Sequence, residues 1–379
     1  MKYPHGIQSK LQQRKEKKSL RSLFVNAEGI DFYSNDYLGL AKSKTIYTEA
    51  IQLLKKKNLE VNSATGSRLI SGNTHFHEEV EEQIANFHQV ETALLFNSGY
   101  DANVGFFSSV PQRGDVVFYD ELIHASIRDG LQMSLAKTYK FKHNNLNELK
   151  RKVDKLTTSG DIFIVTESVF SMDGDTPNLE KLVNYCSRRN VFLIVDEAHA
   201  LGVFGSSGEG VIQAQNLQDK VFARIITFGK GLGAHGAAVL GNAQLKDFLI
   251  NFARSFMYTT AISPQAVATI SSAYQVLESS SAKEKLQQNI HYFQQQVEEF
   301  QLTSRFIKSK SSIQSCLIPG NEEVKNIAEE LQQQEFMVKP ILSPTVPEGQ
   351  ERLRFCLHSY NSKEEIFKVL QLLATFVGE

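Results

Sequence analysis

The chain has 379 residues, of which 41% are hydrophobic and 22% are charged. At roughly 150 residues per domain, this length predicts two or three structural units. Lysine and arginine number 41 and aspartate and glutamate 42, so the formal net charge is −1. The composition excludes collagen-like, low-complexity and disulfide-rich chains, and the near-neutral charge argues against a dedicated nucleic-acid-binding protein.

Targeting and redox signals are weak in this sequence. No uninterrupted apolar run approaches the roughly 18 residues that a membrane span needs, and the basic N-terminus lacks the apolar core of a signal peptide. The three cysteines (Cys186, Cys316 and Cys356) are odd in number and share no CxxC spacing. We therefore expect a cytoplasmic protein with buried thiols and no membrane partner.

The first segment with a clear pattern is basic. Residues 8–21 (QSKLQQRKEKKSLR) carry six lysines and arginines and can form a helix. Such a segment is either a patch that binds an anionic ligand or a nucleic acid, or simply the solvated face of a helix. The sequence leaves both interpretations open.

From residue 72 onward, the pattern predicts alternating helices and strands. Phe76, Val80, Ile84 and Phe87 form an apolar stripe at helical spacing, and Asn73 or Thr74 can cap that helix. Continuous apolar runs of strand length then follow at Ala93–Phe96, Val116–Tyr119, Ile162–Val165, Val191–Val195, Ile225–Phe228 and Ala237–Leu240. Continuous rather than alternating runs are typical of strands buried on both faces, so we expect a mainly parallel sheet in an α/β domain.

A different rhythm begins near residue 280. The apolar spacing predicts a long helix around Leu286–Phe300, and the remaining segment predicts strands at 313–318, 338–341 and 352–357 and helices at 322–334 and 363–376. We therefore expect an N-terminal segment at 1–40, a large α/β domain at 41–278 and a smaller C-terminal α+β domain at 279–379.

Polar residues follow five of the predicted strands directly. Ligands of open parallel sheets bind beyond the carboxyl ends of the strands, so these residues are expected to meet in one site. They are Asn97–Tyr100 after the first strand, Asp120 and His124 after the second, Glu167–Ser171 after the third and Asp196–His199 after the fourth, while Thr227 with Gly229–Gly231 closes the fifth.

Lys230 is the residue with the most specific chemistry in this set. It lies between two glycines after a buried strand, but the GxxxxGK spacing of a phosphate-binding P-loop is missing. A lysine at such a position can form a Schiff base with a carbonyl cofactor, because partial desolvation favours its neutral amine. An ordinary turn lysine is the alternative.

Asp196 and His199 strengthen the cofactor interpretation. An aspartate that ends an apolar strand is costly to bury unless it meets a positive charge, and a protonated pyridine nitrogen is such a partner. His199, three residues later, can bond the same ring. Asp196 could instead cap a helix, and a metal site is disfavoured because no further ligand recurs at suitable spacing. We interpreted His75, His77 and His88 as surface residues of one exposed helix, and we expect no metal.

With these residues assembled, the sequence resembles the α-oxoamine synthases, enzymes of fold type I that use pyridoxal 5′-phosphate (PLP). The likeness runs from about residue 20 to the C-terminus. It rests on the stretches SNDYLGL (34–40), ATGSRLISGNTHFHEEVE (64–81), LLFNSGYDAN (94–103), ELIHASIRDG (121–130), TESVFSMDGD (166–175), VDEAHALGVFG (195–205), TFGKGLGAHGAAVLG (227–241), FMYTTAISP (256–264) and PTVPEGQERLRF (344–355).

The resemblance implies a role for each matching residue. Lys230 would hold PLP covalently, Asp196 would pair with its pyridine nitrogen, His199 would bond its phenolic oxygen and His124 would stack on the ring. Gly99, Tyr100 and Thr227 would bind the phosphate, with Thr259 or Thr260 reaching the phosphate of a partner subunit. Ser171 would contact the cofactor and Asn35 the amino acid. Arg354 would grip the amino acid's carboxylate, with Arg352 nearer the rim, and Arg21 and Thr345 would contact the acyl substrate.

The resemblance also implies an activity and partners. We expect a homodimeric acyltransferase that joins an amino acid to an acyl thioester carried by CoA or an acyl carrier protein. The favoured pair is L-alanine and a pimeloyl thioester, as in biotin biosynthesis, with loss of CO₂ and release of the thiol. Condensation of glycine with acetyl-CoA is the alternative within the family. A non-catalytic protein with the same fold, which binds through the basic segment 8–21, is the alternative from another class.

Overall fold

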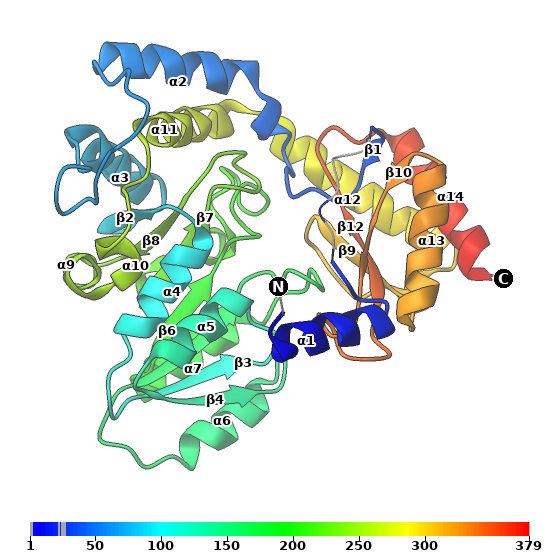
Figure 1. Ribbon diagram of the computed structural model, residues 1–379, viewed down its shortest axis with the longest axis horizontal. Coiled ribbons are helices and arrows are strands. Elements are labelled where there is room, and N and C mark those ends of the chain that lie inside the picture. Colours follow the sequence, from blue (N-terminus) through cyan, green and yellow to red (C-terminus); the bar gives the residue numbers. More distant parts are fainter. Residues whose placement is uncertain (1–2, 22, 24–27, 379) are drawn as a thin grey trace. The chain divides into compact units, whose positions relative to one another are not determined.

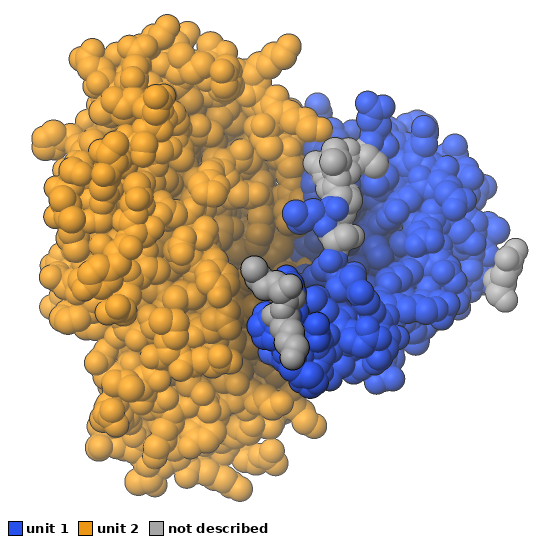
Figure 2. Space-filling model, viewed as in Figure 1, with its two compact units in different colours: residues 1–34, 172–175, 284–379 blue, residues 35–171, 176–283 orange. Residues whose placement is uncertain are grey.

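The computed structural model describes residues 3–21, 23 and 28–378, and the chain divides into two compact units (Figure 2). Unit 1 comprises residues 1–34, 172–175 and 284–379, and unit 2 comprises residues 35–171 and 176–283. The division at 283–284 lies five residues beyond the expected domain boundary. The N-terminal residues, which we treated as a separate segment, fall in unit 1 together with the C-terminal part.

Unit 2 is built on a seven-stranded sheet in the order β2-β8-β7-β6-β5-β3-β4 (Figure 1). The strands are β2 (Thr92–Phe96), β3 (Val116–Asp120), β4 (Lys137–Phe141), β5 (Ile162–Glu167), β6 (Phe192–Asp196), β7 (Ala223–Thr227) and β8 (Ala237–Gly241). Neighbouring strands from β4 to β7 pair in parallel, whereas β8 is antiparallel to both β2 and β7. The expectation of a mainly parallel α/β sheet is therefore confirmed.

Helices cover both faces of this sheet because successive strand residues point to opposite sides. Val117 belongs to a core cluster with residues of α4, α5 and α9, while Val116 and Phe118 belong to a second cluster with residues of α6 and α7. The helices of unit 2 are α2 (Lys44–Lys56), α3 (His75–Phe87), α4 (Gly99–Ser109), α5 (Ala125–Met133), α6 (Leu146–Asp154), α7 (Leu179–Arg189), α8 (Val211–Ala214), α9 (Ala243–Phe252), α10 (Arg254–Met257) and α11 (Pro264–Ser279), with short 3₁₀ turns at Leu40–Lys42 and Gln218–Lys220.

Unit 1 contains a three-stranded antiparallel sheet in the order β11-β12-β9 and a short parallel pair, β1 with β10. Its strands are β1 (Ile30–Asp31), β9 (Ile313–Leu317), β10 (Phe336–Met337), β11 (Lys339–Ile341) and β12 (Arg352–Cys356). Its helices are α1 (His5–Glu16), α12 (Ala282–Glu299), α13 (Asn321–Gln333) and α14 (Lys363–Gly378), with a 3₁₀ turn at Thr303–Arg305. The pairing of β1 with β10 explains why the N-terminal residues join the C-terminal unit.

Two histidines that we expected at the surface are buried, and that expectation is wrong for them. His77 and His88 are both 0% exposed, whereas His75 is exposed as expected. The ring of His77 lies 2.9 Å from the backbone oxygen of Ile262, and that of His88 lies 2.9 Å from the hydroxyl of Tyr274. Burial lowers the pKa of both rings, so they are neutral packing groups of the core.

Among the helices that the structure describes, none is both long and apolar enough to cross a membrane.

Candidate active site

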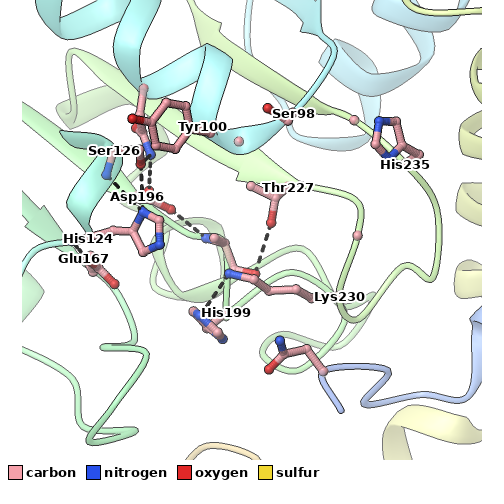
Figure 3. A pocket seen from close by; sticks show the side chains of 16 residues that line it. Ser98, Tyr100, His124, Ser126, Glu167, Asp196, His199, Thr227, Lys230 and His235 are labelled. Atoms are coloured by element: carbon pink, nitrogen blue, oxygen red, sulfur yellow. Dashed lines mark hydrogen bonds between the residues drawn. The ribbon is translucent and has the colours of Figure 1, made fainter. Parts of the chain in front are cut away.

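A cavity of about 290 Å³ lies within unit 2 at the carboxyl edge of the sheet (Figure 3). Its lining comes from the segments that follow five strands, together with one residue near the start of the unit. The lining residues are Asn35, Ser98, Gly99, Tyr100, Asn103, His124, Ser126, Glu167, Asp196, Ala198, His199, Thr227, Gly229, Lys230, His235 and Gly236. Topology alone brings these segments together, because parallel strands end at the same edge.

Eight of the predicted site residues line this cavity. They are Asn35, Gly99, Tyr100, His124, Asp196, His199, Thr227 and Lys230. Ser171, Thr259 and Thr260 belong to unit 2 but are outside the described lining, and Arg21, Thr345 and Arg354 belong to unit 1. The residues implied to bind the cofactor ring and its aldehyde therefore lie together in the cavity of unit 2. The residues implied to contact the acyl substrate, Arg21 and Thr345, belong to unit 1.

Lys230 begins a chain of hydrogen bonds that runs through His199 and Tyr37. Its Nζ lies 2.8 Å from Nε2 of His199, whose Nδ1 lies 2.7 Å from the hydroxyl of Tyr37. That hydroxyl in turn donates to Oδ1 of Asn35 over 3.1 Å. These hydrogen bonds hold the imidazole of His199 between the amine of Lys230 and the phenol of Tyr37, so a proton can be shared between Lys230 and His199 without large movement of either side chain.

Asp196 is held by neutral donors. It is 4% exposed, and its Oδ1 accepts from the backbone N–H of Ala198 over 2.9 Å. Its Oδ2 accepts from Nδ2 of Asn103, also over 2.9 Å. Within the described residues, no lysine or arginine forms an ion pair with this carboxylate. The cavity thus presents a buried acid that has no positive partner among the residues that the structure describes.

His124 is connected to the same network through Ser126. Its Nδ1 lies 2.7 Å from Oγ of Ser126, which also accepts from Nδ2 of Asn103 over 3.0 Å (Figure 3). Burial lowers the pKa of His124 below its usual value of 6.5, so the ring is neutral at pH 7. A neutral, oriented imidazole is suited to lie against an aromatic ring.

Glu167 is a second buried acid in the cavity, and we had assigned it no role. It is 3% exposed, and its Oε1 accepts from the backbone N–H of His124 over 2.6 Å. Burial, with the neighbouring Asp196 carboxylate, raises the pKa of Glu167 well above its usual value of 4.5. The parallel register pairs Glu167 directly with Asp196, so the two acids share one edge of the sheet, and the proximity of the Asp196 carboxylate favours the protonated form of Glu167.

The N-terminus of α4 forms the anion-binding side of the cavity. The side chain of Ser98 caps this helix by accepting from the backbone N–H of Asp101 over 3.1 Å, which leaves the amides of Gly99 and Tyr100 at the first turn. A Cβ on Gly99 would lie 2.4 Å from Cγ2 of Thr227. Only glycine therefore allows the helix start and the end of β7 to approach this closely.

Four more of the predicted residues are hydrogen-bonded outside the cavity lining: Thr259, Thr260, Arg21 and Thr345. Nδ2 of Asn97 donates to Oγ1 of Thr259 over 3.2 Å and to the backbone oxygen of Thr260 over 2.8 Å, which places both threonines beside the segment that leads into α4. In unit 1, Nη2 of Arg21 donates to Oγ1 of Thr345 over 3.3 Å, and both residues are exposed.

The two arginines of β12 differ in a way that corrects our expectation. We expected Arg352 nearer the rim, but it is 2% exposed, compared with 7% for Arg354. Arg352 forms an ion pair with Asp173, a residue of the short segment that joins unit 1. Its charge is thus neutralised within the chain, whereas a carboxylate-binding role stays with Arg354 as a prediction.

The residues present fit PLP, which carries a phosphate, an aldehyde carbon, a phenolic oxygen and a ring nitrogen. The helix start at Gly99 suits the phosphate, Lys230 the aldehyde, His199 the phenolic oxygen and Asp196 the ring nitrogen. Oδ1 of Asn103 is buried without a hydrogen-bond partner, although its residue contacts Asp196. An orphaned acceptor beside an unpaired acid is expected where a ligand completes the site.

Comparison with known proteins agrees with this geometry. The profile of the family described as Aminotransferase class I and II matches residues 27–373. An 8-amino-7-oxononanoate synthase of Emericella nidulans is 39% identical over 98% of this chain and 95% of its own length. A protein of the same name from Lysinibacillus sphaericus is 36% identical over 89% of this chain and 86% of its own.

Solved structures agree as well. A crystal structure of 8-amino-7-oxononanoate synthase from Francisella tularensis has a TM-score of 0.79 and 30% identity, covering 92% of this chain and 98% of that one. A variant of serine palmitoyltransferase from S. paucimobilis, with a bound PLP–myriocin aldimine, has a TM-score of 0.88 at 24% identity. The match covers 98% of this chain and 96% of that one, and it supports the fold. The chain belongs to the α-oxoamine synthases, PLP-dependent acyltransferases within the broader class I and II aminotransferase family.

Proposed function

We propose that this enzyme condenses L-alanine with a pimeloyl thioester to give 8-amino-7-oxononanoate, CO₂ and a free thiol, a step of biotin biosynthesis. The observation that carries the proposal is the near full-length similarity to relatives that bear this activity as their name, at 36–39% identity. The cavity supplies the groups that such a condensation needs. The reaction forms one carbon–carbon bond, between Cα of alanine and the acyl carbon. It breaks the C–S bond of the thioester and the bond between Cα and the carboxylate carbon of alanine.

Lys230 has two tasks in this proposal. Its amine would hold the cofactor through the aldehyde carbon, and the same Nζ, when free, would remove the Cα proton of alanine. His199, 2.8 Å from Nζ, is positioned to share that proton. When bound, PLP supplies a protonated ring that accepts the electrons left at Cα, and Asp196 keeps the ring nitrogen protonated.

The other site residues bind and orient. His124 would lie against the cofactor ring, Gly99, Tyr100 and Thr227 would bind its phosphate, and Ser171 would donate a hydrogen bond to the cofactor. Asn35 would contact the amino acid and Arg354 its carboxylate, because an arginine fork binds a carboxylate by two parallel hydrogen bonds. Arg21 and Thr345, which are hydrogen-bonded to each other, would contact the acyl substrate.

The proposal includes a homodimer in the cytoplasm. Half-buried Thr259 and exposed Thr260 are both hydrogen-bonded to Asn97, and we propose that one of them reaches the cofactor phosphate of the partner subunit. The exposed apolar side chains of Leu69 and Ile70, which are 50% and 86% exposed, support a subunit contact in unit 2. A monomer that binds PLP fully and turns over at assay concentrations would contradict this part.

A substrate matrix tests the proposed function. The purified enzyme is offered alanine, glycine and serine, each with acetyl, succinyl, pimeloyl and palmitoyl thioesters of CoA, and CO₂ and thiol release are followed. We expect alanine with the pimeloyl thioester to give the highest kcat/KM and a product with the mass of 8-amino-7-oxononanoate. Preference for glycine with acetyl-CoA would replace the proposal with the sister activity.

A further inference from the structure

Helix α1 (His5–Glu16) is a helix that unit 1 hardly stabilises. None of its 12 residues is buried, and Ile7 and Leu11 are each 46% exposed. Helices of this length are marginal in water unless an apolar face is packed. A described contact that ties this region to the rest of unit 1 lies after the helix, where Lys18 pairs with Glu322 over 2.6 Å. Something beyond the described contacts of unit 1 is therefore expected to pack against α1.

The side chains of α1 are sorted by chemistry around the helix. At about 100° per residue, Ile7 and Leu11 lie next to each other, with Lys10 and Arg14 on one side of them and Lys15 on the other. These five residues, which we call the α1 basic face, share an arc of about 140°. The opposite side carries two glutamines and one acid, namely Gln12, Gln13 and Glu16.

This arrangement fits a protein partner better than a small anion. From Lys10 to Lys15 the basic residues extend along about 7.5 Å of helix axis, which is more than one phosphate group can span. An apolar centre with a charged rim is the usual anatomy of a protein interface. The net charge of −1 and an apolar ridge of only two helical residues argue against nucleic acid and a lipid surface respectively.

The chain continues from this face to a residue implied to contact the acyl substrate. Arg21 follows three residues after Lys18, and its guanidinium donates to Thr345. We infer that the α1 basic face docks an acidic carrier protein, which brings the acyl group to the enzyme as a thioester on a flexible arm. This inference rests on the proposed function and deepens it, because it selects one of the two possible thioester carriers.

The experiment compares three pimeloyl donors that share the same reacting thioester. Pimeloyl-pantetheine has no anionic carrier, pimeloyl-CoA has the phosphates of CoA, and the pimeloyl carrier protein has an acidic surface. The test variant is Lys10→Gln with Lys15→Gln on the α1 basic face. Its control, Gln12→Glu with Gln13→Glu on the opposite side, changes the net charge by the same amount.

The test variant should raise KM for the carrier-protein donor roughly three- to thirtyfold, the effect of two rim charges, with kcat unchanged. KM for pimeloyl-pantetheine should not change, and the control variant should resemble wild type with all donors. Added salt should reduce the difference between wild type and the test variant for the carrier-protein donor only.

Several results would overturn the inference. They include equal KM values of the two variants for the carrier-protein donor, and a rise in KM of the test variant that also appears with pimeloyl-pantetheine or that is confined to pimeloyl-CoA. A changed oligomeric state of the test variant in sedimentation would also overturn it, as would wild-type binding to anionic vesicles that the test variant loses. Wild-type turnover of pimeloyl-CoA without any turnover of the carrier-protein donor would also overturn it and leave the proposed function standing. Failure of every pimeloyl donor with alanine would instead contradict the proposed function itself.

Discussion

Asp196 and Glu197 are consecutive buried acids with opposite surroundings. Glu197 is 0% exposed, and its Oε2 is paired with Nε of Arg224 over 2.6 Å, a guanidinium that is itself 1% exposed. Asp196 lines the cavity and is held by one backbone N–H and one side-chain amide. A buried charge with its counter-ion in the chain is structural, whereas one without it depends on a ligand for its positive partner.

Arg352 and Arg354 of β12 offer a second comparison, between an arginine paired within the chain and an arginine to which the family resemblance assigns a substrate. Arg352 has its counter-ion in Asp173, and Arg354 is the arginine that the family resemblance assigns to the carboxylate of the substrate. Substitution of a paired charge should cost stability, and substitution of a ligand-directed charge should cost function.

The largest effect is expected at Lys230, the reactive group of the cavity. Lys230→Ala should lower turnover on the order of 10³-fold or more, because it removes both the covalent attachment point and the base. The fold should persist, since the described hydrogen bond of this amine is to His199 within the cavity. Absorbance spectra, circular dichroism and turnover would be compared. Turnover within tenfold of wild type would remove Lys230 from its role.

The pair Asp196→Asn and Glu197→Gln tests the difference between a ligand-directed and a paired charge directly. Asp196→Asn should lower kcat about 10²- to 10³-fold with little change in stability, because a preorganised charge is lost from the site. Glu197→Gln should lower the free energy of unfolding by about 3–5 kcal/mol, because it leaves the buried guanidinium of Arg224 without its counter-ion. Urea unfolding and turnover measure both quantities for each variant. The reverse assignment of the two effects would break the comparison.

In β12 the matched substitutions are Arg354→Lys and Arg352→Lys. We expect Arg354→Lys to raise the alanine requirement roughly 30- to 1,000-fold, since lysine cannot reproduce the two parallel hydrogen bonds. Arg352→Lys should instead lower the stability of unit 1 while alanine affinity changes little, because its partner is Asp173. Alanine titrations of both variants at saturating thioester decide between them. Equal and small effects on alanine affinity would refute the assignment of Arg354.

The smallest effect is expected at Glu167, which shares the edge with Asp196. Because the pKa of Glu167 is raised in the folded protein, its carboxyl keeps a proton there that the unfolded chain releases once the pH exceeds the ordinary pKa of 4.5. Wild-type stability therefore falls as pH rises from there toward the raised pKa, and a glutamine has no such proton to lose. The difference in melting temperature, Glu167→Gln minus wild type, should therefore be larger at about pH 8 than at about pH 5, by about 2 °C or more. A constant difference across this range would show that Glu167 is ionised in the folded protein.

The sequence predicted those parts of the site that topology determines. Asp196, Thr227 and Lys230 follow apolar strands directly, so their meeting at one sheet edge needed no knowledge of side-chain packing. Asn103 and Ser126 were missed because each lies within the first turns of a helix and looks like any polar helical residue. The only available signal was their spacing of four and two residues from Gly99 and His124.

Other differences arise from packing that a linear pattern does not contain. Tyr37 reaches His199 from 162 positions away in the sequence, and a tyrosine in SNDYLGL gives no indication of such a partner. Strand β4 was missed because its residues are mostly exposed at the edge of the sheet, so KTYKF lacks an apolar run. The burial of His77 and His88 depends on Ile262 and Tyr274, which come from distant segments.

The most direct test of the account is to locate the cofactor on the chain. Holoenzyme with bound PLP is reduced with borohydride, digested, and the peptide that carries the pyridoxyl group is identified by mass spectrometry. The account predicts a single labelled peptide with the modification on Lys230, and no label in Lys230→Ala treated in the same way. A pyridoxyl group on any other lysine of the wild-type protein would contradict the assignment of the cavity as the active site.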